Sequence, residues 1–425
     1  MITIFIKGRA PRAPGAGGRS VLRDVAFLRL WCGATASGLA TWALPFVLGL
    51  AVLERVLTAA DLGLLLAART AGFLAAVPVG GVLADRYARR AVVLWSGLAA
   101  AAAAPLLAAG LGRSPALAAA AAAVTGAGQG ACRPAFQALT AEVVDEGRRQ
   151  QANAATTLAV RVTTLAGPGL AVLLAAVLHV RGLLLGLGAL WLVAALLPGS
   201  GAGGRPRTAA TGRVSFAGEF AEGVREARRH PWFVAGLGAL AAVIFTGYSA
   251  TGVALPLVSR DRYGSEAVLA AALSAYTAGA LAGAVAVARW RPRAPGWTAL
   301  AALAGYGAAP LSLVFPVHPA VVIAAYAVAG LGIELFNVPW FTAVQREVAP
   351  ERLARVSSLD FLVSYGLAPV GLALIAPAVG AFGTGPVLAG CALVCFLAPA
   401  TAALTPSARD FSGRRARVRR GVDQA

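Results

Sequence analysis

Charged side chains are scarce in this sequence: only 13% of its 425 residues are Asp, Glu, Lys or Arg, and 58% are hydrophobic. A soluble domain is usually about a quarter charged, so a water-soluble fold would have too little polar surface to cover itself. Apolar runs of about twenty residues, the length that crosses a hydrocarbon core as a helix, recur along the chain. They lack the alternation of barrel strands, so the sequence predicts an all-α membrane protein.

Residues that usually carry catalysis or bind metals are also rare. The three histidines lie near the ends of apolar runs, and no nucleotide-binding loop, dinucleotide fingerprint or nucleophile elbow is present. The four cysteines lie inside apolar runs without metal-ligand spacing or a disulfide framework: Cys32, Cys132, Cys391 and Cys395. We therefore expect no enzymatic chemistry, no metal and no tightly bound cofactor. We also expect no cleavable signal peptide, because the first long apolar run is a full span.

The apolar runs predict twelve transmembrane helices in two six-helix halves, residues 27–198 and 232–405. A cytoplasmic tail (1–26), a central loop (199–231) and a basic tail (406–425) complete the chain. The predicted spans are Phe27–Leu53, Leu62–Ala84, Ala91–Leu111, Ala116–Leu139, Ala152–Val180, Leu183–Pro198, Trp232–Val258, Val268–Ala288, Trp297–Phe315, Ala320–Val344, Val356–Ala378 and Pro386–Leu404.

Basic residues are distributed unevenly between the two sides of this topology. With the N-terminus inside, 29 of the 37 Lys and Arg residues fall on the inner side and three lie within spans. The outer side has only Arg55, Arg113, Arg181, Arg260 and Arg262. Cytoplasmic loops carry an excess of Lys and Arg, so we expect both termini in the cytoplasm. This placement also explains the net charge of +19 without nucleic acid.

The second half of the chain repeats the first. PAFQALTAEVV (134–144) aligns with PWFTAVQREVA (339–349), and residues 156–170 align with residues 357–371. Each segment falls at the fourth and fifth spans of its half. Two pseudo-symmetric halves of this type are typical of secondary transporters, which bind substrate near the membrane midplane between the halves.

The central loop contains one amphipathic segment. Phe216, Phe220 and Val224 recur every four residues beside acidic and basic side chains. This spacing predicts a short helix on the cytoplasmic membrane face, and an ordinary linker helix is an equal alternative.

The run GVLADRYARR between the second and third spans supplies a family resemblance. With the two-half topology, it resembles the loop motif of the major facilitator superfamily, departing from it at Ala88. The motif residues are Gly81, Asp85, Arg86, Arg89 and Arg90. The resemblance implies that Asp85 lies at the seam between halves, pairing with Arg or a helix N-terminus to lock one state of the transport cycle.

A narrower resemblance is to the bacterial efflux branch that includes macrolide and siderophore exporters. It rests on LRDVAFLRLW (22–31), RPAF with QQANA (133–136 and 150–154), and the run from Leu335 to Leu362. Gly167 and Pro168 keep part of the fifth-helix motif associated with antiporters, whereas Thr163, Ala171 and Val172 depart from it. The resemblance implies a bacterial inner-membrane exporter.

Charged residues inside spans are the candidate coupling and substrate residues, because each costs roughly 2.5–3.5 kcal/mol at a helix centre. They are Glu334, Asp360, Arg161, Arg133 and Arg69. Glu334 is our first choice as proton carrier, because a carboxyl in low-dielectric surroundings holds a proton more readily than one in water. The alternative is structural pairing, for instance of an arginine with Glu334 or Asp360; an adjacent arginine would oppose protonation.

Aromatic residues near the presumed cavity level would suit an amphipathic, drug-like substrate. They are Trp42, Tyr248, Tyr276, Trp340 and Tyr365. We therefore expect a monomeric, proton-coupled exporter of a small molecule, embedded in the lipid bilayer. Solute uptake, or a membrane receptor or assembly protein that does not transport, remains the alternative.

Overall fold

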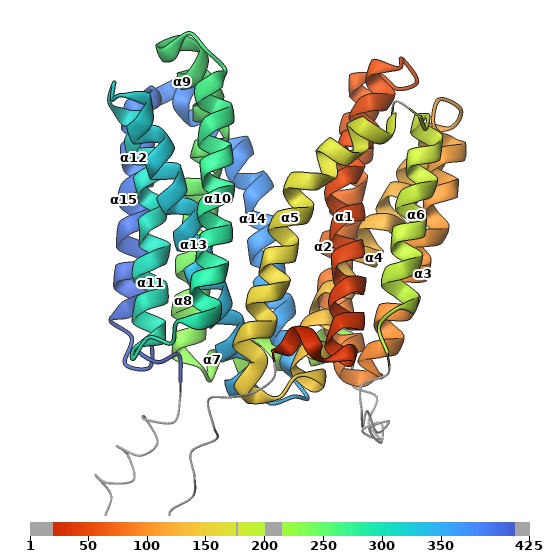
Figure 1. Ribbon diagram of the computed structural model, residues 1–425, viewed down its shortest axis with the longest axis horizontal. Helices are drawn as coiled ribbons and strands as arrows, with labels where there is room; N and C mark the ends of the chain where they lie inside the picture. The colour runs from red at the N-terminus through yellow and green to blue at the C-terminus, as the bar shows by residue number, and fades with distance from the viewer. Residues whose placement is uncertain (1–19, 176, 200–214, 413–425) are drawn as a thin grey trace, which may run out of the picture.

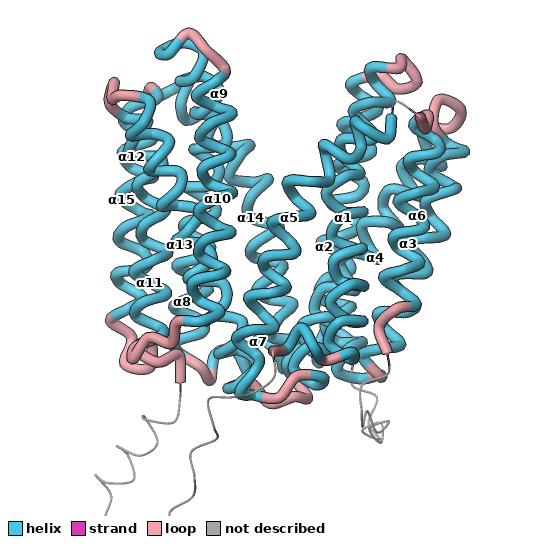
Figure 2. The backbone as a smooth tube through the Cα atoms, in the orientation of Figure 1, coloured by secondary structure: helices cyan, strands magenta, loops and turns pink. Residues whose placement is uncertain are grey.

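The computed structural model describes residues 20–175, 177–199 and 215–412. The rest of the predicted N-terminal tail, central loop and C-terminal tail, with basic residues such as Lys7, Arg205 and Arg414, lies outside these ranges. In the described residues the structure is helical and has no strand (Figure 2). The fold is that of an all-α membrane protein, as the sequence predicts.

The first half contains six long helices after a short 3₁₀ turn, η1 (Val21–Arg23). They are α1 (Val25–Leu53), α2 (Ala59–Arg86), α3 (Arg89–Gly110), α4 (Pro115–Val143), α5 (Arg149–Ala175) and α6 (Val180–Leu196), with η2 (Glu146–Arg148) between α4 and α5. The amphipathic segment of the central loop forms α7 (Phe216–Arg228).

The second half also forms six helical segments, two of which are interrupted. The seventh combines α8 (Pro231–Ala242), the π-helical stretch η3 (Val243–Tyr248) and α9 (Ser249–Tyr263); the ninth combines α11 (Pro295–Ala304), η4 (Gly305–Gly307) and α12 (Ala308–Val314). The others are α10 (Ala267–Arg289), α13 (Pro319–Glu347), α14 (Leu353–Phe382) and α15 (Thr384–Ala403).

Ten of these segments are long and apolar enough to cross a membrane, and α6 is a shorter apolar helix. With α4, they are consistent with twelve spans. Polar caps fix several helix starts: Asp24 accepts backbone N–H groups at α1, and Thr58 with Asp61 forms a capping box at α2.

The boundary between the fifth and sixth spans corrects the sequence prediction. We expected the fifth span to run to Val180, but α5 ends at Ala175. The next helix, α6, already begins at Val180, with His179 as its N-cap residue. The run from Leu170 to Val180 is apolar apart from His179, so hydropathy gave no sign of the turn.

Close helix packing repeats between the halves, as the sequence repeat implies. A Cβ at Gly126 of α4 would collide with the carbonyl oxygen of Arg69 in α2, and a Cβ at Gly330 of α13 would collide with that of Tyr276 in α10. The second and fourth helices therefore pack backbone to backbone in both halves. Across the seam, α2 meets α14 and α5 meets α10, as a pseudo-two-fold axis requires.

The two halves lie close together at one end and diverge toward the other (Figure 1). The close end is where α1 begins and α15 ends, and α7 lies across it. In the predicted topology this is the cytoplasmic side. The structure therefore places the closest approach of the two halves at one side of the molecule.

Candidate functional site

Asp85 lies at the closed end and joins the two halves. It is near the end of α2, and its carboxylate accepts backbone hydrogen bonds from Ala354 (3.1 Å) and Arg355 (3.0 Å) in the first turn of α14. The Arg355 side chain adds an ion pair at 3.1 Å. A carboxylate at a helix N-terminus satisfies otherwise unpaired N–H groups and interacts favourably with the helix dipole.

Gly81 allows this contact by bringing α2 close to α14. A Cβ at Gly81 would lie 2.8 Å from the Cβ of Ser358 and 3.0 Å from the carbonyl oxygen of Ala354. Real Cβ atoms essentially never approach others that closely. A larger residue at position 81 would push the two helices apart and draw Asp85 away from its donors.

The three motif arginines reach different parts of the structure. Arg86 forms an ion pair with Glu219 of α7 at 2.5 Å, and Arg90 donates to the carbonyl of Leu196 at 3.2 Å. Arg89 contacts Glu142 at 3.3 Å and donates to the carbonyl of Pro350 in the other half. Arg86 and Arg89 therefore link elements across the closed end, whereas Arg90 holds α3 to α6.

Helix α7 carries acidic residues that pair with arginines near the start of α14. Glu222 contacts Arg355 at 3.0 Å, and Glu226 contacts Arg352. Together with the Arg86–Glu219 pair, these contacts attach the central-loop helix to both halves. The sequence predicted the helix but not these partners.

Buried amide side chains between the halves were missed at the sequence level. Asn153 of α5 donates to Thr342 (2.9 Å) and Gln345 (3.0 Å) of α13, and Gln345 donates to Gln137 of α4 at 2.8 Å. Gln137 and Thr342 are equivalent positions in the sequence repeat. Uncharged polar residues at equivalent positions of the repeat could have indicated these contacts from the sequence.

Arg161 and Glu334 form an ion pair that also bridges the halves, from α5 to α13. Glu334 is fully buried, whereas the Arg161 side chain remains 21% exposed. The Arg161 guanidinium also lies 5.7 Å from the ring centroid of Tyr276. Arg161 lies twelve residues into α5, so the pair is at mid-depth, about 18 Å along the helix axis.

Arg133 of α4 and Arg69 of α2 are the two other arginines inside spans of the first half. Arg133 donates to the hydroxyl of Tyr365 in α14 at 2.6 Å and lies 4.5 Å from that ring's centroid. Arg69 donates to the carbonyl of Thr41 at 3.2 Å and to the side chain of Gln129 at 2.8 Å. Neither forms an ion pair with a carboxylate among the described residues.

Two candidates lie elsewhere than expected. Trp340 is fully buried and stacks on Phe233 and Phe336 inside the second half, so it does not line a cavity. Its indole N–H donates to Asp360 at 3.0 Å, and Asp360 is only 3% exposed. Trp340 of α13 and Asp360 of α14 therefore face an aromatic core, which their depth along the chain could not reveal.

The remaining aromatic candidates are at least partly open. Tyr248 is 49% exposed, and Trp42, Tyr276 and Tyr365 are half-buried. Gly167 of α5 packs against the backbone of α1, where its added Cβ would lie 3.3 Å from the nitrogen of Ala43. Pro168 lies within α5 beside it.

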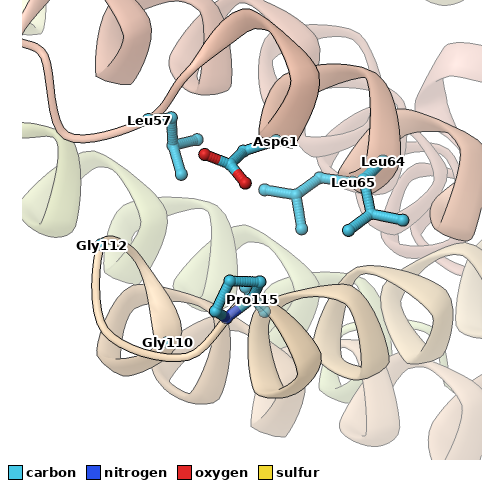
Figure 3. A pocket seen from close by; sticks show the side chains of 8 residues that line it. Leu57, Asp61, Leu64, Leu65, Gly110, Gly112 and Pro115 are labelled. Atoms are coloured by element: carbon cyan, nitrogen blue, oxygen red, sulfur yellow. The ribbon is translucent and has the colours of Figure 1, made fainter.

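A small pocket lies at the opposite end from Asp85, between the start of α2 and the turn joining α3 to α4 (Figure 3). Leucine side chains and glycines form most of its wall. Its one carboxylate, Asp61, is engaged by Thr58 in the cap of α2. None of the arginines inside the spans lines this pocket.

Comparisons with known proteins agree with this architecture. The family model of the Major Facilitator Superfamily matches residues 30–372. Among solved structures, the human organic anion transporter MFSD10 (TETRAN) is similar with a TM-score of 0.68 and 16% identity, over 90% of this chain and all of that chain. No curated protein sequence matches. With its two helical halves and their seam at Asp85, the chain belongs to the Major Facilitator Superfamily.

Proposed function

We propose that this protein is a secondary active transporter that exports a small amphipathic molecule in exchange for protons. The observation that carries the proposal is the one-sided seam: Asp85 of α2 is bound by the first turn of α14, while the halves diverge at the opposite end (Figure 1). In the proposed bacterial inner-membrane topology, with both termini cytoplasmic, this arrangement is closed to the cytoplasm.

Alternating access would require the seam to separate. The contacts of Asp85, of Arg89 and of the Asn153–Gln345 amides all join the two six-helix halves near the closed end. Each is a short-range polar contact that is lost when the helices move apart. Rocking of the halves would break this set and form another at the opposite end.

Glu334 is the proposed proton carrier, and Arg161 gives it a role in the conformational change. The two side chains are in direct contact across the halves. A proton on Glu334 would replace Arg161 as the neutralising charge and so weaken one link between α5 and α13. Proton binding would then favour separation of the halves at this depth.

Two alternatives remain distinct from export. Solute uptake would use the same fold in the opposite direction, and a receptor or assembly protein would keep the fold without transport. The similar human protein is an organic anion transporter, and that substrate class fits the arginines of this chain. The charges retained at mid-depth favour a transporter over a receptor.

Everted membrane vesicles test the proposal. We expect proton-driven accumulation of an anionic or a cationic xanthene dye, carboxyfluorescein or rhodamine 123, that a protonophore abolishes. Glu334→Gln should remove the proton dependence, whereas Glu54→Gln, at the exposed end of α1, should not. Accumulation equal to that of vesicles lacking the protein would contradict transport; unchanged proton-driven accumulation in Glu334→Gln would contradict the assigned carrier.

A further inference from the structure

Three arginines of the first half gather around one tyrosine of the second half at mid-depth. This central basic cluster consists of Arg69, Arg133, Arg161 and Tyr365. Arg133 donates to the Tyr365 hydroxyl at 2.6 Å, and Arg69 and Arg161 both lie within electrostatic range of that hydroxyl. Helices α2, α4, α5 and α14 supply the four side chains. The cluster therefore spans both halves.

The charges of this cluster do not balance. Among the described residues, Arg161 has a carboxylate partner, Glu334. Arg69 and Arg133 contact only neutral acceptors and aromatic faces, although they lie within electrostatic range of each other. Asp360 accepts a hydrogen bond from Trp340 and forms no ion pair with either arginine among the described residues. In the part of the chain that the structure describes, the cluster thus has two positive charges without a counterion. Two like charges in low-dielectric surroundings repel one another, which makes an added anion favourable there.

Buried hydrogen-bond donors without acceptors lie beside this excess charge. The Nε atom of Arg69 is buried and has no partner among the described residues. Trp42, which follows Thr41 in the sequence, also has a buried indole N–H without a partner among the described residues. Unsatisfied buried donors cost free energy. An acceptor that enters the site beside Arg69 would satisfy its Nε–H group.

Aromatic faces lie beside Arg133. Tyr365 packs against Phe73 with ring centroids 5.2 Å apart, and Arg133 also lies 6.0 Å from the Phe361 centroid. Arg69, Arg133 and Tyr365 are half-buried rather than sealed. A ligand for this site would thus combine a negatively charged acceptor group with a flat apolar body.

We propose that the central basic cluster binds the anionic group of an aromatic organic anion, such as a carboxylate or sulfonate. Arg69 and Arg133 contact the anionic group, while Arg161 stays paired with Glu334. The proposal rests on the proposed transport function, because it names the substrate class of that site. Charge-assisted bonds to two arginines would select anions over cations of the same size.

Equilibrium binding to the purified full-length protein in nonionic detergent tests the proposal without requiring transport. The probes are carboxyfluorescein and rhodamine 123, which share a xanthene ring system and carry opposite charges. Fluorescence anisotropy should show that carboxyfluorescein binds with a dissociation constant below about 1 mM. Rhodamine 123 should bind at least about tenfold more weakly.

Matched variants locate the binding site. Arg69→Gln and Arg133→Gln should each weaken carboxyfluorescein binding by at least about tenfold, because each removes a charged donor. Arg133→Lys, which keeps the charge, should retain part of the affinity. Arg113→Gln, which removes a charge from an exposed loop, should leave binding within about twofold. An unchanged elution profile in size-exclusion chromatography shows that each variant is folded.

The outcomes separate this proposal from the proposed function. Absence of carboxyfluorescein binding, equal binding of rhodamine 123, or unchanged affinity in both glutamine variants would overturn the anion site. In each of those cases, proton-driven accumulation of rhodamine 123 in vesicles would still support the proposed transport function. Anion binding that depends on Arg69 and Arg133, in a protein that moves neither dye, would instead support the site and contradict transport.

Discussion

Asp85 is the only acidic residue in the loop motif, and its contacts explain why an acid is needed there. Arginines in this stretch are accounted for by membrane topology, whereas acids contribute little to orientation. The structure gives Asp85 two backbone donors and one guanidinium, all from α14. The family resemblance predicted a seam contact of this kind. It could not specify Arg355, because partner choice depends on how two distant helices meet.

Replacing Asp85 with Asn should therefore change transport without preventing membrane insertion. Asn keeps the size but loses the charge, and hydrogen bonds to charged groups contribute about 1.5–3 kcal/mol each. We expect dye flux in proteoliposomes to change by roughly tenfold. Asp61→Asn, at the opposite end of α2, is the matched control with near-normal flux. Normal flux in Asp85→Asn would reduce the motif to a topology signal.

The Arg161–Glu334 pair makes a second prediction about single residues. Removing one partner of a buried pair leaves an uncompensated charge and typically costs 3–5 kcal/mol, whereas removing both costs less. Arg161→Gln should therefore lower the apparent unfolding temperature in detergent, and the double variant Arg161→Gln/Glu334→Gln should recover part of the loss. If the fall in unfolding temperature of the double variant equalled the sum of the falls in Arg161→Gln and Glu334→Gln, the two residues would not be coupled.

Helices of this chain were more predictable than their contacts. Long apolar runs, capping residues and the repeat were enough to find the spans, because a helix satisfies its own backbone in lipid. The direction in which each helix face points was not predictable from depth alone. Trp340 and Asp360 show this limit, since both lie at cavity level along the chain yet face an aromatic core. The turn between α5 and α6 was hidden by unbroken hydropathy.

The crossing of α2 and α14 depends on the absence of a side chain at Gly81. Gly81→Ala should separate the helices at the closed end, because its Cβ would lie 2.8 Å from that of Ser358. A single cysteine introduced at Ser357 of α14, buried in this structure, should then react faster with a membrane-impermeant maleimide. Gly63→Ala is the control on the same helix, since nothing lies within 4 Å of its Cβ. Equal reactivity in both variants would contradict a close crossing at Gly81.

At the scale of the whole molecule, charge distribution predicts which side faces the cytoplasm. The segment between α4 and α5, which includes Gly147, lies at the closed end, and the turn between α3 and α4, which includes Arg113, lies at the open end (Figure 1). Single cysteines at Gly147 and at the exposed Arg113 should label differently in intact bacterial cells, with only position 113 accessible to an impermeant maleimide. In everted vesicles the pattern should reverse. Labelling of position 147 in intact cells would invert the proposed topology, and with it the proposed direction of opening.

Alternating access requires the two halves to move against one another at the seam. Cysteines at Asn153 of α5 and Thr342 of α13, whose side chains are in contact at 2.9 Å, allow that movement to be blocked by a short thiol-cleavable cross-linker. The background should lack the four native cysteines. Dye flux in proteoliposomes should fall to background when the halves are linked and return when the linker is reduced. Full flux in the cross-linked protein would contradict alternating access at this seam.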